Sequence, residues 1–188
     1  MPDVTVVAPG CDWEVEAATD ALIETPGTCY FRLDKSSAGN TRQPGEEFRL
    51  GRGRVVREGR RLAIMTCGGI LGVVLDAAAP LRAAGEDPTV VRLHTLRPMD
   101  AEFVVNLARS HEALLIVEEH SVIGGLGGAV AEVLMDAGVH PAGWQRLGLR
   151  EGFSSIVGSQ EYLRARYGLN ADAVLAAARE LLRAVTSA

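Results

Sequence analysis

Residues 114–134, LLIVEEHSVIGGLGGAVAEVL, decide the fold class of this chain. An apolar run ends in two acids and a histidine, four glycines follow within five positions, and a helix-like pattern then begins. A strand that turns through glycines into a helix is the building unit of a parallel α/β sheet. The glycines either expose backbone N–H groups that bind an anion or let neighbouring groups approach the backbone closely.

Close packing or a subunit contact is the favoured interpretation of the glycine-rich turn. A helix N-terminus attracts anions, but GGLGG lacks the Lys-Ser/Thr of a P-loop and departs from GxGxxG. The preceding Glu118 and Glu119 would also repel a pyrophosphate. A nucleotide-binding α/β domain is therefore kept only as an alternative. The interface candidates are Gly124, Gly125, Gly127, Gly128, Glu119 and His120.

Alternating strands and helices continue on both sides of this turn. The apolar patterns predict strands at 54–58, 61–67, 89–94, 113–117 and 144–149, and helices at 70–84, 101–110, 125–137, 159–167 and 170–185. The first two strands are expected to form a hairpin around Gly59 and Arg60, and Asp100 is expected to cap a helix. The pattern predicts a mixed, mostly parallel open sheet with helices on both faces.

The first 34 residues predict a β-α-β unit: a strand at Val4–Val7, a helix at 13–24 capped by Asp12, and a strand at 28–33. Two parallel strands and one helix cannot bury themselves, so we expect the tail of a domain whose beginning is elsewhere. A polar, Gly- and Pro-containing stretch follows, in which residues 48–50 predict a short docking strand. The predicted divisions are 1–37, a linker at 38–53, and 54–188.

Composition excludes several classes of function. The chain has 188 residues, 47% hydrophobic content and a net charge of −5, which argues against a nucleic-acid groove. It has neither a bilayer-length apolar run nor a signal-peptide pattern. Three cysteines without CxxC spacing predict a reduced protein. We therefore expect a cytoplasmic protein without nucleic-acid or membrane partners.

Few side chains suggest chemistry. His120 beside Glu118 and Glu119 permits an acid–base pair, although a solvated loop-end histidine is favoured. Cys67 is expected to be a small buried hydrophobe. The other histidines lack zinc-site spacing, so no metal site is expected. They are His94, His111 and His140.

Arg32 ends the second predicted strand, where parallel sheets bind ligands, and an arginine there suits a phosphate or carboxylate. Lys35 and Arg42 lie close to it in the sequence. The alternative, ordinary solvated linker charge, stays open. No candidate completes a catalytic set.

Several stretches, taken in order, resemble the C-terminal portion of transketolase-type, thiamine-diphosphate-dependent enzymes. The likeness covers nearly the whole chain, and the second subunit of split transketolases is the best match. PDVTVVAPGCDWEVEAATDAL and TCYFRL resemble the last crossover of the pyrimidine-binding domain. Four further stretches resemble the C-terminal domain of these enzymes: IMTCGGI, VVRLHTLRPMD, LLIVEEHSVIGGLGGAVAEVL and VGSQEYLRARYGLNADAVLAAARELL.

The resemblance implies two-carbon ketol transfer on thiamine diphosphate, with Mg²⁺ holding the diphosphate, between domains of different subunits. This sequence lacks a GDG motif followed by asparagine, and it lacks the early pyrimidine-binding domain with its activating glutamate. No catalytic residue is therefore carried over, and no cofactor is expected on this chain alone. By position, Arg32 or else Lys35 resembles the basic residue that meets the sugar phosphate.

The implied partners are a diphosphate-binding transketolase subunit, or the missing N-terminal part, and a second copy through the C-terminal domain. We expect residues 45–188 to fold alone and the chain to be inactive by itself. The runner-up is a non-enzymatic protein-interaction module derived from the same domain.

Overall fold

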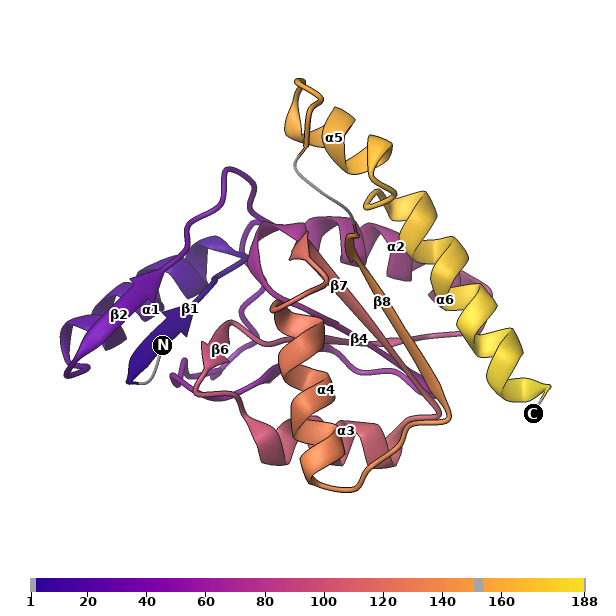
Figure 1. The fold of residues 1–188 in the computed structure, drawn as a ribbon, viewed down its shortest axis with the longest axis horizontal. Helices are drawn as coiled ribbons and strands as arrows, with labels where there is room; N and C mark the ends of the chain where they lie inside the picture. The colour runs from indigo at the N-terminus through magenta and orange to yellow at the C-terminus, as the bar shows by residue number, and fades with distance from the viewer. Residues whose placement is uncertain (1–2, 151–153, 188) are drawn as a thin grey trace.

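The computed structural model describes residues 3–150 and 154–187, which form a small sheet beside a larger one (Figure 1). The larger sheet has the order β3-β5-β4-β7-β8, in which only the edge strand β3 is antiparallel. Its strands are β3 (Arg54–Arg57), β4 (Leu62–Thr66), β5 (Thr89–Arg92), β7 (Ala113–Ser121) and β8 (Gly143–Leu149). The predicted fold class is confirmed.

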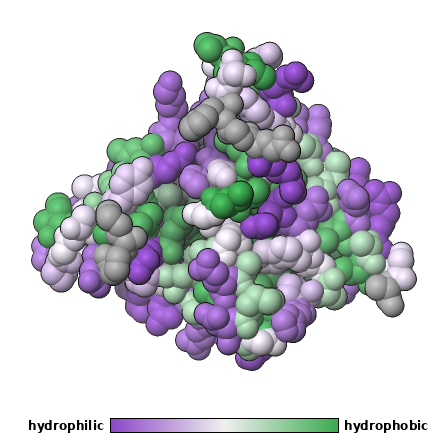
Figure 2. Space-filling view, viewed as in Figure 1, coloured by the Kyte–Doolittle hydropathy of each residue, from purple (hydrophilic) through white to green (hydrophobic). Residues whose placement is uncertain are grey.

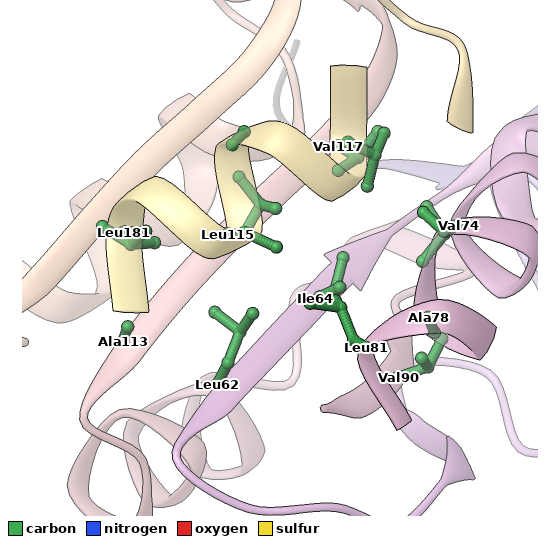
Figure 3. Packing of buried hydrophobic residues seen from close by; sticks show 14 of the residues in the cluster. Leu62, Ile64, Val74, Ala78, Leu81, Val90, Ala113, Leu115, Val117 and Leu181 are labelled. Atoms are coloured by element: carbon green, nitrogen blue, oxygen red, sulfur yellow. The ribbon is translucent and has the colours of Figure 1, made fainter. Parts of the chain in front are cut away.

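Helices cover both faces of this sheet because its central strands are apolar on both sides. Helices α2 (Leu71–Ala83) and α6 (Ala171–Thr186) pack on one face, with Ile64 and Leu115 beneath them (Figure 3). Helices α3 (Ala101–Ser110) and α4 (Leu126–Asp136) cover the other. Full burial of these strands excludes water from the sheet and supplies most of the apolar stabilisation.

The smaller sheet has the order β2-β1-β6 and carries helix α1 (Asp12–Ile23). Strands β1 (Val4–Val7) and β2 (Thr28–Phe31) are parallel, as the β-α-β pattern predicts. Strand β6 (Thr95–Arg97) was not predicted, and it pairs antiparallel with β1. The N-terminal unit is therefore joined to the rest of the chain by backbone hydrogen bonds on the β1 side.

The predicted hairpin around Gly59 and Arg60 is wrong, because β3 pairs with β5 rather than with β4. The crossover through α2 returns the chain parallel to β4 and places β5 along that edge. Gly59 packs against the backbone of Pro88, and the Arg60 N–H donates to the Asp87 carbonyl. These contacts direct the chain away from a tight turn.

Two local predictions near the N-terminus also fail. Cys11, not Asp12, occupies the N-cap position of α1, and the Gly10 N–H donates to Glu14 instead. Residues 48–50 form no strand. Phe48 instead stacks on the buried His94, with ring centroids 4.3 Å apart.

Three of the predicted helices have side-chain caps at their N-termini. Helices α3, α5 (Gln160–Arg166) and α6 are capped by the side chains of Asp100, Ser159 and Asn170. Residues 68–70 form a 3-10 turn ahead of α2. Among the described residues, none of the helices combines the length and apolar character that a membrane crossing requires.

Candidate functional site

The carboxyl ends of β1, β2, β4 and β7 meet around a cavity of about 100 Å³. This junction brings together Arg32, Cys67 and His120, which are far apart in the sequence. The remaining lining residues are Val6, Ala8, Tyr30, Leu96, Glu118, Gly125 and Leu126. Several sequence candidates therefore share one location between the two sheets.

The N-terminus of α4 holds an anion that belongs to the chain itself. The Glu118 carboxylate accepts hydrogen bonds from the Leu126 N–H at 2.7 Å and the Gly127 N–H at 2.9 Å. Its side chain is 1% exposed, and burial raises the pKa of this carboxyl above its usual value. Glu118 occupies the position that a ligand phosphate would need, which removes the support for a nucleotide site here.

Two of the four glycines leave room for neighbouring side chains at this helix N-terminus. A Cβ on Gly125 would overlap the Glu118 carboxylate, and one on Gly127 would meet both Glu118 and Arg146. Gly124 has a φ of +71°, and a Cβ on Gly124 or Gly128 would have no neighbour within 4 Å. Close packing is thus observed at two positions, and the other two face open space.

Arg32 follows β2 directly, and its side chain is 36% exposed. Its Nη2 donates to the Glu119 main-chain carbonyl at 3.4 Å, and its Nη1 lies 3.9 Å from the Asp34 Oδ2. The guanidinium is thus held at the junction while part of it faces solvent. Lys35 is exposed, and Arg42 lies with Trp13, where its guanidinium is 5.3 Å from the ring centroid.

Helix α5 adds two residues that the sequence analysis did not identify. Arg164 Nη2 contacts the Glu119 carboxylate at 2.6 Å, and Gln160 Nε2 donates to Asp34 Oδ1 at 2.8 Å. Gln160 also reaches Glu119 at 3.1 Å. Because these partners are separated by 41 or more positions, no local pattern could have revealed them.

A buried ion cluster beneath the junction was also missed. Arg92, which is 0% exposed, donates to Glu14 at 2.9 Å, and Arg54 donates to the same carboxylate at 2.9 Å. Burial alone would raise the pKa of Glu14, but the Arg92 guanidinium, together with His94 and the Gly10 N–H, lowers it to about 2. The cluster joins α1 to strands β3 and β5.

Cys67 and His120 differ in burial and in their contacts. Burial raises the pKa of Cys67 to about 11, so its thiol stays protonated near neutrality. His120 is half-exposed, and its Nδ1 lies 2.8 Å from the Ser121 carbonyl. Within residues 3–150 and 154–187, no group of three or more His, Cys, Asp or Glu could hold a metal ion.

Comparison with known proteins places the chain in a family. The sequence profile described as "Transketolase, C-terminal domain" matches residues 51–174. The putative uncharacterized transketolase family protein y4mN of Sinorhizobium fredii is 33% identical over 97% of this chain and 53% of its own length. The 6-deoxy-6-sulfo-D-fructose transketolase subunit SqwH of a Clostridium species is 34% identical over 96% of this chain and 55% of its own length.

A solved structure gives the same result. A protein described as "split gene transketolase, inactive beta4 tetramer" superposes with a TM-score of 0.88 at 35% identity. The superposition covers 97% of this chain and 59% of that one. The chain thus spans about half the length of the curated relatives named above. It belongs to the transketolase family and carries that family's C-terminal domain.

Proposed function

We propose that this chain forms the C-terminal part of a thiamine-diphosphate-dependent enzyme that transfers a two-carbon ketol unit between sugar phosphates. The observation that carries the proposal is the outer edge of β2. Within residues 3–150 and 154–187, no strand pairs with that edge. Three apolar side chains of this unit are exposed: Tyr30 in β2 at 57%, Leu33 shortly after it at 60%, and Ile23 at the end of α1 at 74%. An open strand edge flanked by apolar side chains suits a continuing sheet.

The missing strands would come from the rest of a pyrimidine-binding domain, for which residues 1–37 are the proposed tail and 38–53 the link to the domain at 54–188. The cofactor would bind between the completed pyrimidine-binding domain and a diphosphate-binding subunit. It would supply the carbanion chemistry that the transfer needs. The described residues offer no place for its diphosphate at α4, because Glu118 occupies that helix N-terminus.

Arg32 is the proposed ligand for the phosphate end of the sugar substrate. Its guanidinium is half-exposed at the carboxyl end of β2, where parallel sheets bind ligands. An arginine fork matches phosphate geometry. Lys35 remains a second candidate, but its side chain is exposed outside the lining of the junction cavity.

Self-association is proposed through the connection between β7 and α4. Ile123 is 78% exposed beside Gly124, and Figure 2 shows a hydrophobic patch near the middle of the face where β7 leads into α4. Gly128, Glu119 and His120 would border this contact, with Gly125 and Gly127 shaping the turn. The assembly is proposed to be cytoplasmic.

The test of the phosphate ligand is the Arg32→Met variant in the enzyme reconstituted with a diphosphate-binding transketolase subunit. Loss of a charged phosphate contact should raise KM for a phosphorylated substrate roughly tenfold or more. A non-phosphorylated substrate of the same length should be affected much less. Arg42→Met is the matched control, and equal KM values for Arg32→Met and wild type would contradict the assignment.

A further inference from the structure

Four charged side chains form a chain across the junction, with an arginine at each end and two carboxylates between them, and one of the arginines is the proposed phosphate ligand. They are Arg32, Asp34, Glu119 and Arg164, and the amide of Gln160 joins the two carboxylates in the middle. The family assignment does not account for this arrangement. It connects α5, which lies near the C-terminal end of the chain, to the end of β2.

Arg164 holds the Glu119 carboxylate firmly. Its Nε and Nη2 donate to the same Glu119 oxygen at 3.0 and 2.6 Å. The Arg164 side chain is 11% exposed and that of Glu119 is 21% exposed. The Arg164 Nη2 also donates to Ser36 Oγ at 2.7 Å. A charge-assisted contact that is shielded from water is stronger than an exposed ion pair.

The other end of Glu119 touches Arg32. The Arg32 Nη2 donates to the Glu119 main-chain carbonyl at 3.4 Å, so the backbone of Glu119 lies next to the guanidinium. A glutamate side chain has several staggered rotamers, and some of them return the carboxylate toward its own carbonyl. A carboxylate that moved to about 2.8 Å from the guanidinium would form a charge-assisted hydrogen bond and compete with any anionic ligand.

Asp34 is restrained in a similar way. Ser36 N–H and Gln160 Nε2 donate to Asp34 Oδ1 at 3.1 and 2.8 Å. Its other oxygen, Oδ2, stays 3.9 Å from Arg32 Nη1, longer than a hydrogen-bonded ion pair. Side chains of α5 therefore hold an oxygen of both Asp34 and Glu119, and neither carboxylate forms a short hydrogen bond with Arg32.

We propose that Arg164 is a positioning residue that holds the Glu119 carboxylate away from Arg32, so that the Arg32 guanidinium can receive the phosphate of a sugar substrate. This inference rests on the proposed function, which assigns the phosphate to Arg32. Without Arg164, the Glu119 carboxylate is released, pairs with Arg32 and competes with the ligand.

The test uses the purified 188-residue chain and inorganic phosphate. An NMR titration of the ¹⁵N-labelled chain, at constant ionic strength because salt screens charges, follows the Nε–Hε signal of Arg32. The variants are Arg164→Met, Glu119→Gln and the double variant, with Arg32→Met to assign the signal. Arg166→Met is the matched control because Arg166 is an exposed arginine on the same helix.

Arg164→Met is expected to weaken phosphate binding roughly three- to tenfold. The double variant should return close to wild type, because the amide that replaces the Glu119 carboxylate carries no competing charge. Glu119→Gln alone and Arg166→Met should bind at least as well as wild type. Rescue by the second substitution separates positioning from a purely structural role. Circular dichroism checks that each variant folds.

Three results would overturn the inference. Wild-type affinity in Arg164→Met, no rescue in the double variant, or weakened binding in Glu119→Gln each contradicts the positioning role and leaves the phosphate assignment standing. A wild-type titration in which phosphate leaves the Arg32 signal unchanged contradicts both the inference and the proposed phosphate ligand.

Discussion

Glu14 shows how one buried side chain can hold two parts of a fold together. Its carboxylate is 0% exposed and is bonded by Arg92, by Arg54 and by the Gly10 N–H. Removing one member of a buried charged group leaves the others unpaired in a poorly solvating interior. The packing of α1 against the larger sheet therefore depends on Glu14 more than on its exposed neighbours.

Glu14→Gln is expected to lower the free energy of unfolding by roughly 3–5 kcal/mol at neutral pH. The ionised carboxylate has its pKa lowered from 4.5 to about 2, so its stabilisation is present above pH 4.5 and is lost as pH falls toward 2. Urea titrations between pH 3 and pH 7 measure this. The control is Glu16→Gln, an exposed position on α1. A variant equally destabilised at every pH would contradict the assignment.

The start of α4 requires glycine at position 125 but has room for a side chain at position 128. Gly125 leaves room for the Glu118 carboxylate that caps the helix, whereas Gly128 faces open space. The helix N-terminus therefore has a built-in anion, and its position relative to β7 is set by that contact. Substituting alanine at each position separates the two roles.

Gly125→Ala should be destabilising by about 2 kcal/mol or more, because the new methyl group displaces a buried capping carboxylate. Gly128→Ala should be neutral or stabilise by up to about 1 kcal/mol, because alanine is the better helix former. Thermal or urea unfolding of the two variants gives the comparison. Equal effects at the two positions would show that Glu118 does not determine the need for glycine.

Sequence patterns identified the helices and the buried strands well, because those elements are encoded locally. Apolar periodicity and capping residues such as Asp100 suffice to place a helix. Apart from the Asp12 cap and the strand at 48–50, the errors concern pairing: β3 was assigned to the wrong neighbour, and the three-residue β6 was overlooked. Strand pairing depends on the crossover and on burial, which adjacent residues do not determine.

The candidate site was predictable only in part, for the same physical reason. Arg32 was identifiable because it ends a strand, and Glu119 because it precedes the glycine-rich turn. Their contact, and the approach of Arg164, join residues that are 87 and 45 positions apart. Such contacts arise from tertiary packing and leave no periodic signal in the sequence.

Within the described residues, the molecule presents the open outer edge of β2 and the exposed Ile123 in the connection between β7 and α4. If the β7–α4 connection mediates self-association, a charge there should disrupt it. Ile123→Lys is expected to shift sedimentation toward the monomer by weakening the dimer at least roughly tenfold. Met135→Lys, at a 54% exposed position on α4, is the control. If Ile123→Lys self-associates as strongly as wild type, the proposed contact at the β7–α4 connection is contradicted.

In the proposed function, the thiamine site lies outside the described residues, and this chain supports assembly and binds the substrate phosphate. Steady-state ketol transfer, measured with thiamine diphosphate, Mg²⁺, a ketose phosphate donor and an aldose phosphate acceptor, tests that division. The purified chain should show no turnover alone. Turnover should appear when polypeptides with the diphosphate-binding domain and the rest of the pyrimidine-binding domain are added. Turnover by the purified chain alone would contradict the account.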